Sequence, residues 1–268
     1  MVSDSCKKRF GKIMMEDMEL ISQEEIAPRI FSMVLKGEMV EQMLAGQFLH
    51  IRVPDDSKLL RRPISISEID PDRHTCRLIY RVEGGGTAIF SQLPFGSFLS
   101  VMGPQGNGFD LKGLGQGARA LIIGGGIGVP PLVQVAKQLH EQGVEVHSVL
   151  GFATKEAVIL EEELKQYGQV TITTDDGSYG IQGNVSTVVE TLNEDIDAVY
   201  SCGAPGMLKY VNSKFYDHPR AYISMESRMA CGMGACYACV VHLENASQAA
   251  NKRVCEDGPV FETGTIVM

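Results

Sequence analysis

The sequence predicts a multidomain protein of the β and α/β classes: an N-terminal antiparallel β-barrel, a parallel-sheet α/β domain and a small C-terminal module. Three observations predict this. The chain has 268 residues, enough for two or three domains of ordinary size. Short strand-like runs give way to alternating strand-like and helix-like runs, and three cysteines then fall within nine positions. The expected domains are residues 11–112, 113–221 and 222–268.

The first domain consists of short runs with rough alternation of apolar and polar residues, separated by clusters of Gly, Pro and Asp. Such runs are typical of strands joined by turns. Five or six of them at this spacing favour a small antiparallel barrel. The runs are RIFSMVLKG, GQFLHIRV, RRPISISEI, TCRLIYRVE and GSFLSVMGP.

The second domain alternates strand and helix four times, which predicts a parallel sheet with helices on its faces. ARALIIGGG is a buried strand that runs into glycines, and PPLVQVAKQLHEQG follows with apolar residues at helical spacing. Proline starts this helix and Gly143 ends it. Further helices are expected in AVILEEELKQYG, NVSTVVETLN and GMLKYVNSKF, each between strand-like runs.

The last module is too small to bury a core of its own, so an inorganic group would help it fold. Its cysteines follow C-x4-C-x2-C-x15-C, the plant-type [2Fe–2S] spacing, in which one tight loop supplies three thiolates and a later strand the fourth. Gly232 and Gly234 allow positive φ and bring backbone N–H groups near the sulfurs. The expected ligands are Cys231, Cys236, Cys239 and Cys255.

Three other readings of these cysteines remain. Zinc also binds four cysteines, usually as two close pairs, which fits an x4 then x2 triplet poorly. Disulfides are disfavoured in a reducing compartment, and the N-terminus lacks the apolar segment of a secretory signal. Unliganded core cysteines are the third alternative.

Charge and hydropathy argue against two classes of partner. The formal net charge is -9, whereas a nucleic-acid surface needs an excess of Lys and Arg. The longest uncharged run, residues 120–136, is shorter than a membrane span and is interrupted by Gly and Pro-Pro. We therefore expect a cytoplasmic protein that binds neither nucleic acid nor membrane.

Three short motifs of the barrel region suit a flavin nucleotide. In RRPIS, Arg62 is a forked donor suited to pyrophosphate, Pro63 stiffens the strand, and Ser65 can donate to a flavin ring nitrogen. IYR at 79–81 offers an aromatic face and a second arginine, and GGGT at 84–87 opens a helix whose N–H groups suit phosphate. Each motif alone is more often purely structural, so the order of the three carries the argument.

In the second domain, IIGGGIGVPPL ends a buried strand and opens a helix, where parallel sheets bind nucleotides. Pro131 stands where the third glycine of G-x-G-x-x-G belongs, and no acidic residue follows the next strand, so an ordinary Rossmann dehydrogenase fits poorly. Glu145 begins that strand and is expected to be only a polar edge. In SCGAPGML, Cys202 lies either near a nicotinamide or packed under a helix.

RPIS, GGGIGVPP and CGAP in this order resemble the ferredoxin–NADP reductase superfamily. CGMGACYACVV and VCEDGPVF narrow the resemblance to the electron-transfer subunits of dihydroorotate dehydrogenase B, from about residue 11 to residue 268. In that superfamily an aromatic residue commonly stands at the position of Ile64, and Tyr80 is the expected substitute for stacking on the flavin.

The resemblance implies a set of cofactor residues. The FAD-binding residues would be Arg62, Pro63, Ile64, Ser65, Ile79, Tyr80, Arg81, Gly86 and Thr87. The NAD-binding residues, placed by the two glycine motifs, would be Gly124, Gly125, Gly126, Gly128, Cys202 and Gly203. The four cysteines named above would hold the [2Fe–2S] cluster.

The resemblance also implies the reaction. Dihydroorotate is oxidised to orotate, in pyrimidine biosynthesis, at FMN on a partner catalytic subunit, and electrons pass through the cluster and FAD to NAD+. A flavin exchanges both hydride and single electrons, which explains its place between the other two groups. NAD is favoured over NADP because GFATKEA offers only Lys155 to a 2′-phosphate. The expected assembly is a heterotetramer of two subunits of each kind.

We expect the partner to bind around GMGACYA, with Met233 and Tyr237 exposed. No acid–base pair stands out because the proton chemistry would belong to the partner. Two alternatives remain: the same architecture serving a sulfide dehydrogenase or a ferredoxin–NADP reductase, and a non-enzymatic zinc-binding interaction module.

Overall fold

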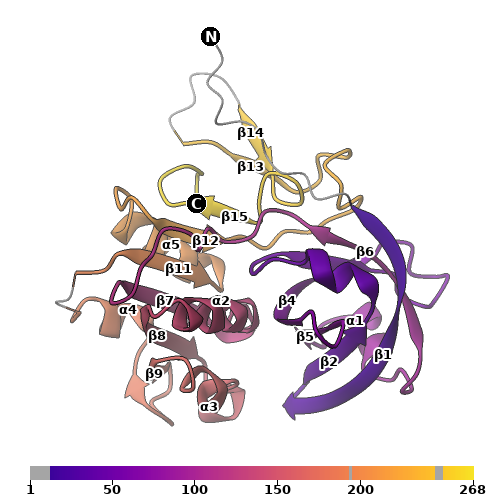
Figure 1. Cartoon of the computed structure of the whole chain (residues 1–268), viewed down its shortest axis with the longest axis horizontal. Coiled ribbons are helices and arrows are strands. Elements are labelled where there is room, and N and C mark those ends of the chain that lie inside the picture. Colours follow the sequence, from indigo (N-terminus) through magenta and orange to yellow (C-terminus); the bar gives the residue numbers. More distant parts are fainter. Residues whose placement is uncertain (1–12, 193–194, 245–249) are drawn as a thin grey trace.

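The computed structural model describes residues 13–192, 195–244 and 250–268. A β-barrel and an α/β unit lie side by side, and the C-terminal module lies across the top of both (Figure 1). The three units follow the order expected from the sequence. Among the described residues, no helix is long and apolar enough to cross a membrane.

The barrel is closed and antiparallel, with strand order β1-β2-β5-β4-β3-β6. A short helix, α1 (Gly85–Phe90), and a 3-10 turn, η2 (Glu38–Gln42), join strands of the barrel. Inward-facing Met18, Leu35, Leu49, Ile66 and Leu78 are fully buried and fill it. The strands are β1 (Met14–Ala27), β2 (Ile30–Lys36), β3 (Phe48–Ile51), β4 (Arg62–Asp70), β5 (Thr75–Arg81) and β6 (Phe98–Gln105).

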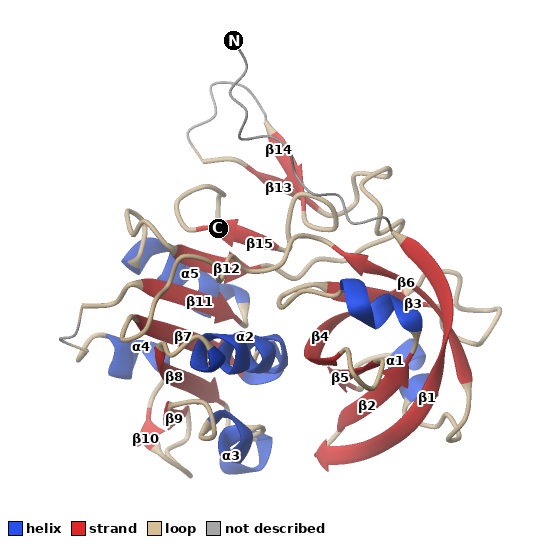
Figure 2. Ribbon diagram, in the orientation of Figure 1, coloured by secondary structure: helices blue, strands red, loops and turns tan. Residues whose placement is uncertain are grey.

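The α/β unit is a seven-stranded sheet of order β10-β9-β8-β7-β11-β12-β15, shown in red at the left of Figure 2. The first six strands are parallel and β15 is antiparallel to β12. The strands are β7 (Arg119–Gly125), β8 (Glu145–Phe152), β9 (Gln169–Thr174), β10 (Ile181–Gln182), β11 (Ala198–Cys202), β12 (Ala221–Ser224) and β15 (Val260–Glu262).

Helices cover both faces of the sheet because successive β7 residues point to opposite sides. Ile122 packs with α2 (Pro130–Glu141) and α3 (Glu161–Leu164). Leu121 and Ile123 pack with α4 (Val185–Val189) and α5 (Pro205–Lys214) on the other face. The expected Pro start of α2 and its end at Gly143 are confirmed.

Two helices are shorter than their sequence patterns predict. The run 157–168 follows the 3-10 turn η4 (Lys155–Ala157) and yields only α3, because Leu160 before α3 takes a left-handed φ of 63°. Of the run 184–193, residues 184–192 are described and yield only α4, capped by the Asn184 side chain, which accepts a hydrogen bond from the Ser186 N–H. Glu145 begins β8 and pairs with Arg119 at 3.3 Å, which confirms a polar edge.

The C-terminal module is built into the rest of the molecule. The expected boundary between residues 221 and 222 falls inside β12, and β15 of the module extends the parallel sheet by pairing with β12. A hairpin, β13 (Val240–His242) and β14 (Asn251–Arg253), completes the module. The Asn107 N–H donates to the Gly258 carbonyl at 2.6 Å, so the module is also fastened to the end of the barrel.

The barrel and the sheet meet along β4 and α2. The buried Gln134 side chain of α2 accepts the Ile69 N–H of β4 at 2.9 Å. Lys137 lies 3.6 Å from Glu68, and Arg77 pairs with Glu163 of α3. These contacts fix the two units at the angle that forms the cavities described below.

Candidate cofactor-binding sites

A cavity of about 350 Å³ lies between the barrel and the other two units. Strands β4 and β5 and the start of α1 form one wall of this cavity. All nine residues expected to bind FAD line it: Arg62, Pro63, Ile64, Ser65, Ile79, Tyr80, Arg81, Gly86 and Thr87. The opposite wall comes from Ile127 and from the chain after β12, which contributes Met225, Glu226, Ser227 and Met229.

The Arg62 guanidinium lies against Gly86 at the start of α1. A Cβ on Gly86 would lie 2.7 Å from Arg62 Nε, so only glycine leaves room for the arginine there. Arg62 Nη1 donates to the Leu60 carbonyl at 2.6 Å, which orients the group. The Thr87 hydroxyl accepts the N–H groups of Glu83 and Gly84 at 3.1 and 3.3 Å, which shapes the turn. A forked cation beside a glycine turn fits a pyrophosphate.

Tyr80 is engaged in the barrel core. Its ring stacks on Phe31 with centroids 6.0 Å apart and meets Phe90 edge-on, and its hydroxyl donates to Gln23 Oε1 at 3.0 Å. Burial raises the pKa of this hydroxyl. Because only 4% of Tyr80 is exposed, the ring has no free face for stacking on a flavin. The structure therefore gives no support to Tyr80 as the substitute for the aromatic residue that is missing at Ile64.

A second cavity, of about 410 Å³, lies at the carboxyl ends of the parallel strands, where open α/β sheets bind nucleotides. Gly125, Gly126, Gly128 and Gly203 line it, as expected from the two glycine motifs. Phe152, Asp175 and Met207 complete much of its wall.

Gly124 and Cys202 were expected in this group but do not line the cavity. A Cβ on Gly124 would touch Val129, Leu150 and Leu132, so this glycine serves helix packing. Cys202 is 1% exposed within the core, and burial raises the pKa of its thiol. Of the two positions expected for Cys202, near a nicotinamide or packed under a helix, the structure shows the packed one.

The two cavities adjoin. Arg81, Ile127 and Glu226 line both of them. The Glu226 side chain opens into this shared space with protein around it, and loss of solvent, followed by the charge of Glu83, raises its pKa. Sequence reasoning missed Glu226 because it assigned the chain after residue 221 to the cysteine module. Its place just after β12, at the same carboxyl edge as the glycine motifs, was the available signal.

The four cysteines come together as two pairs. Side-chain hydrogen bonding joins Cys231 with Cys236 and Cys239 with Cys255. Burial opposes ionisation of Cys231, but the N–H groups of Met233 and Cys236 outweigh it and lower its pKa to about 7. Both N–H groups lie 3.4 Å from its sulfur. Burial raises the pKa of Cys255 to about 12.

This arrangement of the sulfurs fits two irons better than one zinc. A tetrahedral zinc site with Zn–S bonds of about 2.3 Å brings all four sulfurs within about 3.8 Å of one another. Among the described residues, no three cysteine sulfurs lie within 4.8 Å of one another. Two thiolates per iron fit a [2Fe–2S] cluster, and backbone N–H groups aimed at the sulfurs fit its negative charge.

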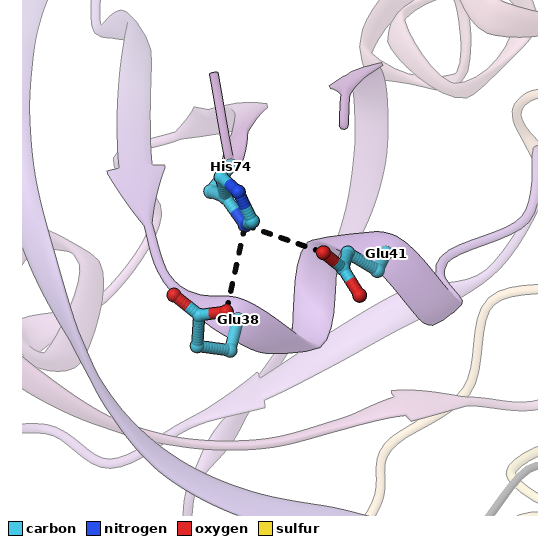
Figure 3. Close-up of side chains that lie close together, drawn as sticks. All are labelled: Glu38, Glu41 and His74. Atoms are coloured by element: carbon cyan, nitrogen blue, oxygen red, sulfur yellow. Dashed lines mark ion pairs between the residues drawn. The ribbon is translucent and has the colours of Figure 1, made fainter. Parts of the chain in front are cut away.

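Within the described ranges, one group of three possible metal-ligating side chains has its ligand atoms within 4.8 Å of one another: Glu38, Glu41 and His74 (Figure 3). His74 Nδ1 lies 3.6 Å from Glu38 and 3.7 Å from Glu41. Both carboxylates are exposed, and none of the three residues lines either cavity. We interpret this group as a surface ion-pair cluster.

The cysteine loop is held by glycines and by one arginine. Gly232 and Gly234 have φ of 69° and 76°, as expected. Arg253 donates to the Gly234 carbonyl at 2.8 Å and lies over the Tyr237 ring at 5.2 Å. Met233 and Tyr237 are 50% and 60% exposed, which confirms the prediction that they are accessible.

Three family models match successive parts of the chain. The oxidoreductase FAD-binding domain matches residues 15–109, and the oxidoreductase NAD-binding domain matches residues 122–213. The iron-sulfur cluster binding domain of dihydroorotate dehydrogenase B matches residues 226–267. The last match begins at Glu226, where the chain leaves β12.

Whole-chain relatives agree with this order. The electron transfer subunit of dihydroorotate dehydrogenase B (NAD(+)) from Streptococcus pneumoniae R6 is 67% identical over 96% of this chain and 100% of its own length. The Enterococcus faecalis V583 subunit is 48% identical over 94% and 98%. A solved NADH-dependent reduced ferredoxin-NADP oxidoreductase aligns with TM-score 0.83 at 27% identity, over 94% of this chain and 90% of that one. The chain, with its FAD-binding, NAD-binding and iron–sulfur cluster binding domains, belongs to the family of dihydroorotate dehydrogenase B electron transfer subunits.

Proposed function

We propose that this chain accepts electrons from a partner subunit that oxidises dihydroorotate and delivers them to NAD+, through a [2Fe–2S] cluster and FAD. One observation carries the proposal: the FAD cavity borders both other sites. It shares Arg81, Ile127 and Glu226 with the nucleotide cavity, and its wall includes Met229 and Pro259 of the cysteine module. When bound, FAD supplies exchange between hydride and single electrons, and the cluster supplies single-electron transfer.

Within the FAD cavity, each residue has a proposed role that matches its position. Arg62 and the turn at Gly86 and Thr87 would hold the pyrophosphate. Pro63, Ser65 and the backbone of Ile64 would line one side of the flavin ring. Ile79, Tyr80 and Arg81 would complete the wall, with Arg81 also facing the nucleotide cavity.

For the nucleotide, we propose contacts with Gly125, Gly126, Gly128 and Gly203, whose missing side chains let a ligand approach the backbone. Asp175, at the end of β9, supports NAD over NADP, because a carboxylate accepts a ribose hydroxyl and repels a 2′-phosphate. Glu226 would lie beside the nicotinamide, where it can hold a proton near the site of hydride transfer.

The four paired cysteines are the proposed cluster ligands, and the exposed loop around Met233 and Tyr237 is the proposed docking site for the FMN-containing catalytic subunit. An electron leaving that subunit must reach the cluster over a short distance, and this loop is the part of the cluster site that is open to solvent. We further propose a cytoplasmic complex of two subunits of each kind, to be checked by light scattering of the co-expressed pair.

Charge substitutions in the loop test this function. Met233→Glu and Tyr237→Glu should abolish most dihydroorotate-driven NAD+ reduction by the reconstituted complex and leave NADH-driven dye reduction by this subunit intact. Ile181→Glu, at an apolar position 45% exposed on β10 of the α/β unit, is the matched control and should change neither activity. Equal loss of both activities would show that the loop acts within this chain and does not dock a partner.

A second candidate is electron exchange with ferredoxin, favoured by the 0.83 TM-score to the ferredoxin-NADP oxidoreductase chain. The 67% identity to a dihydroorotate dehydrogenase subunit outweighs a 27% identity. Rapid NADH-dependent reduction of ferredoxin without a catalytic subunit would reverse this choice.

A further inference from the structure

Two buried polar side chains of the barrel face the cysteine loop. His50 on β3 is 0% exposed, and Gln105 at the end of β6 is 1% exposed. Neither ring nitrogen of His50 and neither side-chain polar atom of Gln105 has a hydrogen-bond partner within the described part of the chain. A buried donor or acceptor without a partner costs about 1–3 kcal/mol, so four such polar atoms at one place call for an explanation.

Both side chains lie on the outer face of the barrel, under the module. Leu49 and Ile51 point into the barrel core, whereas Phe48 packs with Cys239 and Cys255 of the module. His50 shares the face of Phe48 because side chains alternate along a strand. Gln105 lies opposite Phe48 on the neighbouring strand.

The side chains of His50 and Gln105 both approach Gly232, which directly follows the proposed ligand Cys231. A Cβ built on Gly232 would lie 2.9 Å from Gln105 Oε1 and from His50 Cε1, and closer still to His50 Nδ1. On the other side, His50 is paired across the sheet with Pro63, which lines the FAD cavity. The two polar groups therefore lie between the flavin site and the cluster loop.

The chemistry of both side chains suits a sulfur acceptor. Burial, followed by the charges of Arg61 and Arg62 nearby, lowers the pKa of His50 to about 4, so the ring is neutral and keeps one N–H donor. Gln105 offers an amide NH₂. The sulfurs of an iron–sulfur cluster are anionic acceptors, and hydrogen bonds to them raise its reduction potential by stabilising the more negative reduced state.

We propose that His50 and Gln105 donate N–H hydrogen bonds to sulfur atoms of the bound cluster beside Cys231 and Gly232, and so set its reduction potential on the side facing the flavin. This inference rests on the proposed cysteine ligands. It makes both barrel residues positioning groups for electron transfer between FAD and the cluster.

The test is a redox titration of the cluster, followed by electron paramagnetic resonance, in the full chain loaded with FAD and cluster. His50→Leu and Gln105→Met should each lower the ratio of reduced to oxidised cluster about tenfold at a fixed potential, which is 59 mV for a one-electron couple. Ser67→Ala is the matched control, because it removes another fully buried hydroxyl without a partner, on β4, that lines neither cavity.

A second measurement needs no variant. Histidine-selective ¹⁵N labelling of the wild-type protein should introduce a ¹⁵N hyperfine coupling into the spectrum of the reduced cluster. An unchanged potential in variants with full iron and sulfide content, or the same shift in Ser67→Ala, would overturn the proposal, as would absence of the coupling. A wrong assignment of the cysteine ligands would give a different result from a wrong hydrogen-bond proposal. In that case, Cys231→Ser would still contain a full cluster.

Discussion

Gly128 lies where the 3-10 turn η3 (Gly126–Gly128) contacts the end of β11. We expect this close contact to set the position of the bound nucleotide, and substitution of Gly128 tests that expectation. In the structure, a Cβ on Gly128 would lie 2.5 Å from the Cys202 oxygen and from the Gly203 nitrogen and Cα. Ordinary van der Waals contact begins at 3.4 Å, so Gly128→Ala leaves a shortfall of about 0.9 Å. All three atoms belong to the backbone, so no side-chain rotation can relieve the clash.

The turn must therefore move away from β11 by nearly 1 Å. Misplacing a binding group by 1 Å can cost about 10²-fold in rate. We expect kcat/KM for NADH in dye reduction to fall by about that factor, with a loss of about 1–3 kcal/mol in unfolding free energy from overpacking. Iron content should stay at the wild-type value, because no residue of the cysteine loop is touched. Ile127 in the displaced turn also lines the FAD cavity, so FAD content is measured in the same samples and kcat/KM is expressed per bound FAD.

Gly206→Ala on α5 is the matched control, since no atom lies within 4 Å of its built Cβ. It should leave kcat/KM unchanged. Photoreduction of FAD without NADH separates binding from flavin chemistry and should proceed normally in Gly128→Ala. Wild-type kcat/KM for NADH in Gly128→Ala, or an equal loss in Gly206→Ala, would refute the reasoning that this contact places the nucleotide.

The remaining predictions concern the two carboxylates that line the nucleotide cavity. Asp175→Ser should raise kcat/KM for NADPH about tenfold relative to NADH by removing a like charge, whereas Asp176→Ser, which lies outside the cavity wall, should not; steady-state kinetics with both nucleotides decides this. Glu226 has a pKa raised above its ordinary 4.5, so its ionised form is disfavoured in the folded protein, and stability falls as pH rises from the unfolded through the folded pKa. Glu226→Gln should therefore have a higher Tm than wild type at pH 8 and no advantage at pH 4. Equal Tm values at pH 8 would contradict a raised pKa.

The sequence predicted half of the residues around the FAD cavity, because these belong to local motifs. RPIS, IYR and GGGT each occupy one strand or turn, and barrel closure brings them to one wall. Asp175 and Glu226 escaped because each follows a strand end with no glycine motif beside it. The pairing of β15 with β12 was also out of reach, since three residues carry no periodic signal and their partner lies about 40 positions away.

The close approach of His50 to Gly232 could not be predicted from the sequence for a different reason. A histidine within the strand-like run GQFLHIRV reads as one polar position of an alternating pattern, and its neighbours Leu49 and Ile51 follow that pattern. What makes it unusual is that the face opposite the barrel core is also buried, because the cysteine module covers it. Burial of both faces arises only once the cysteine-bearing part of the module packs onto β3, so no local sequence pattern can predict it.

Contacts among the barrel, the sheet and the cysteine module hold the three sites in fixed positions relative to one another. The module reaches the sheet through β15 and the barrel through Asn107 and Gly258, and Gln134 ties the sheet to the barrel. Each unit is therefore attached to both others, and the cavities between them keep a fixed shape. Electron transfer requires cofactors held at short, constant distances, whereas the partner must be able to approach from solvent. The structure meets both needs. Cys239 and Cys255 are buried against β3, whereas Met233 and Tyr237 are exposed on the cysteine loop.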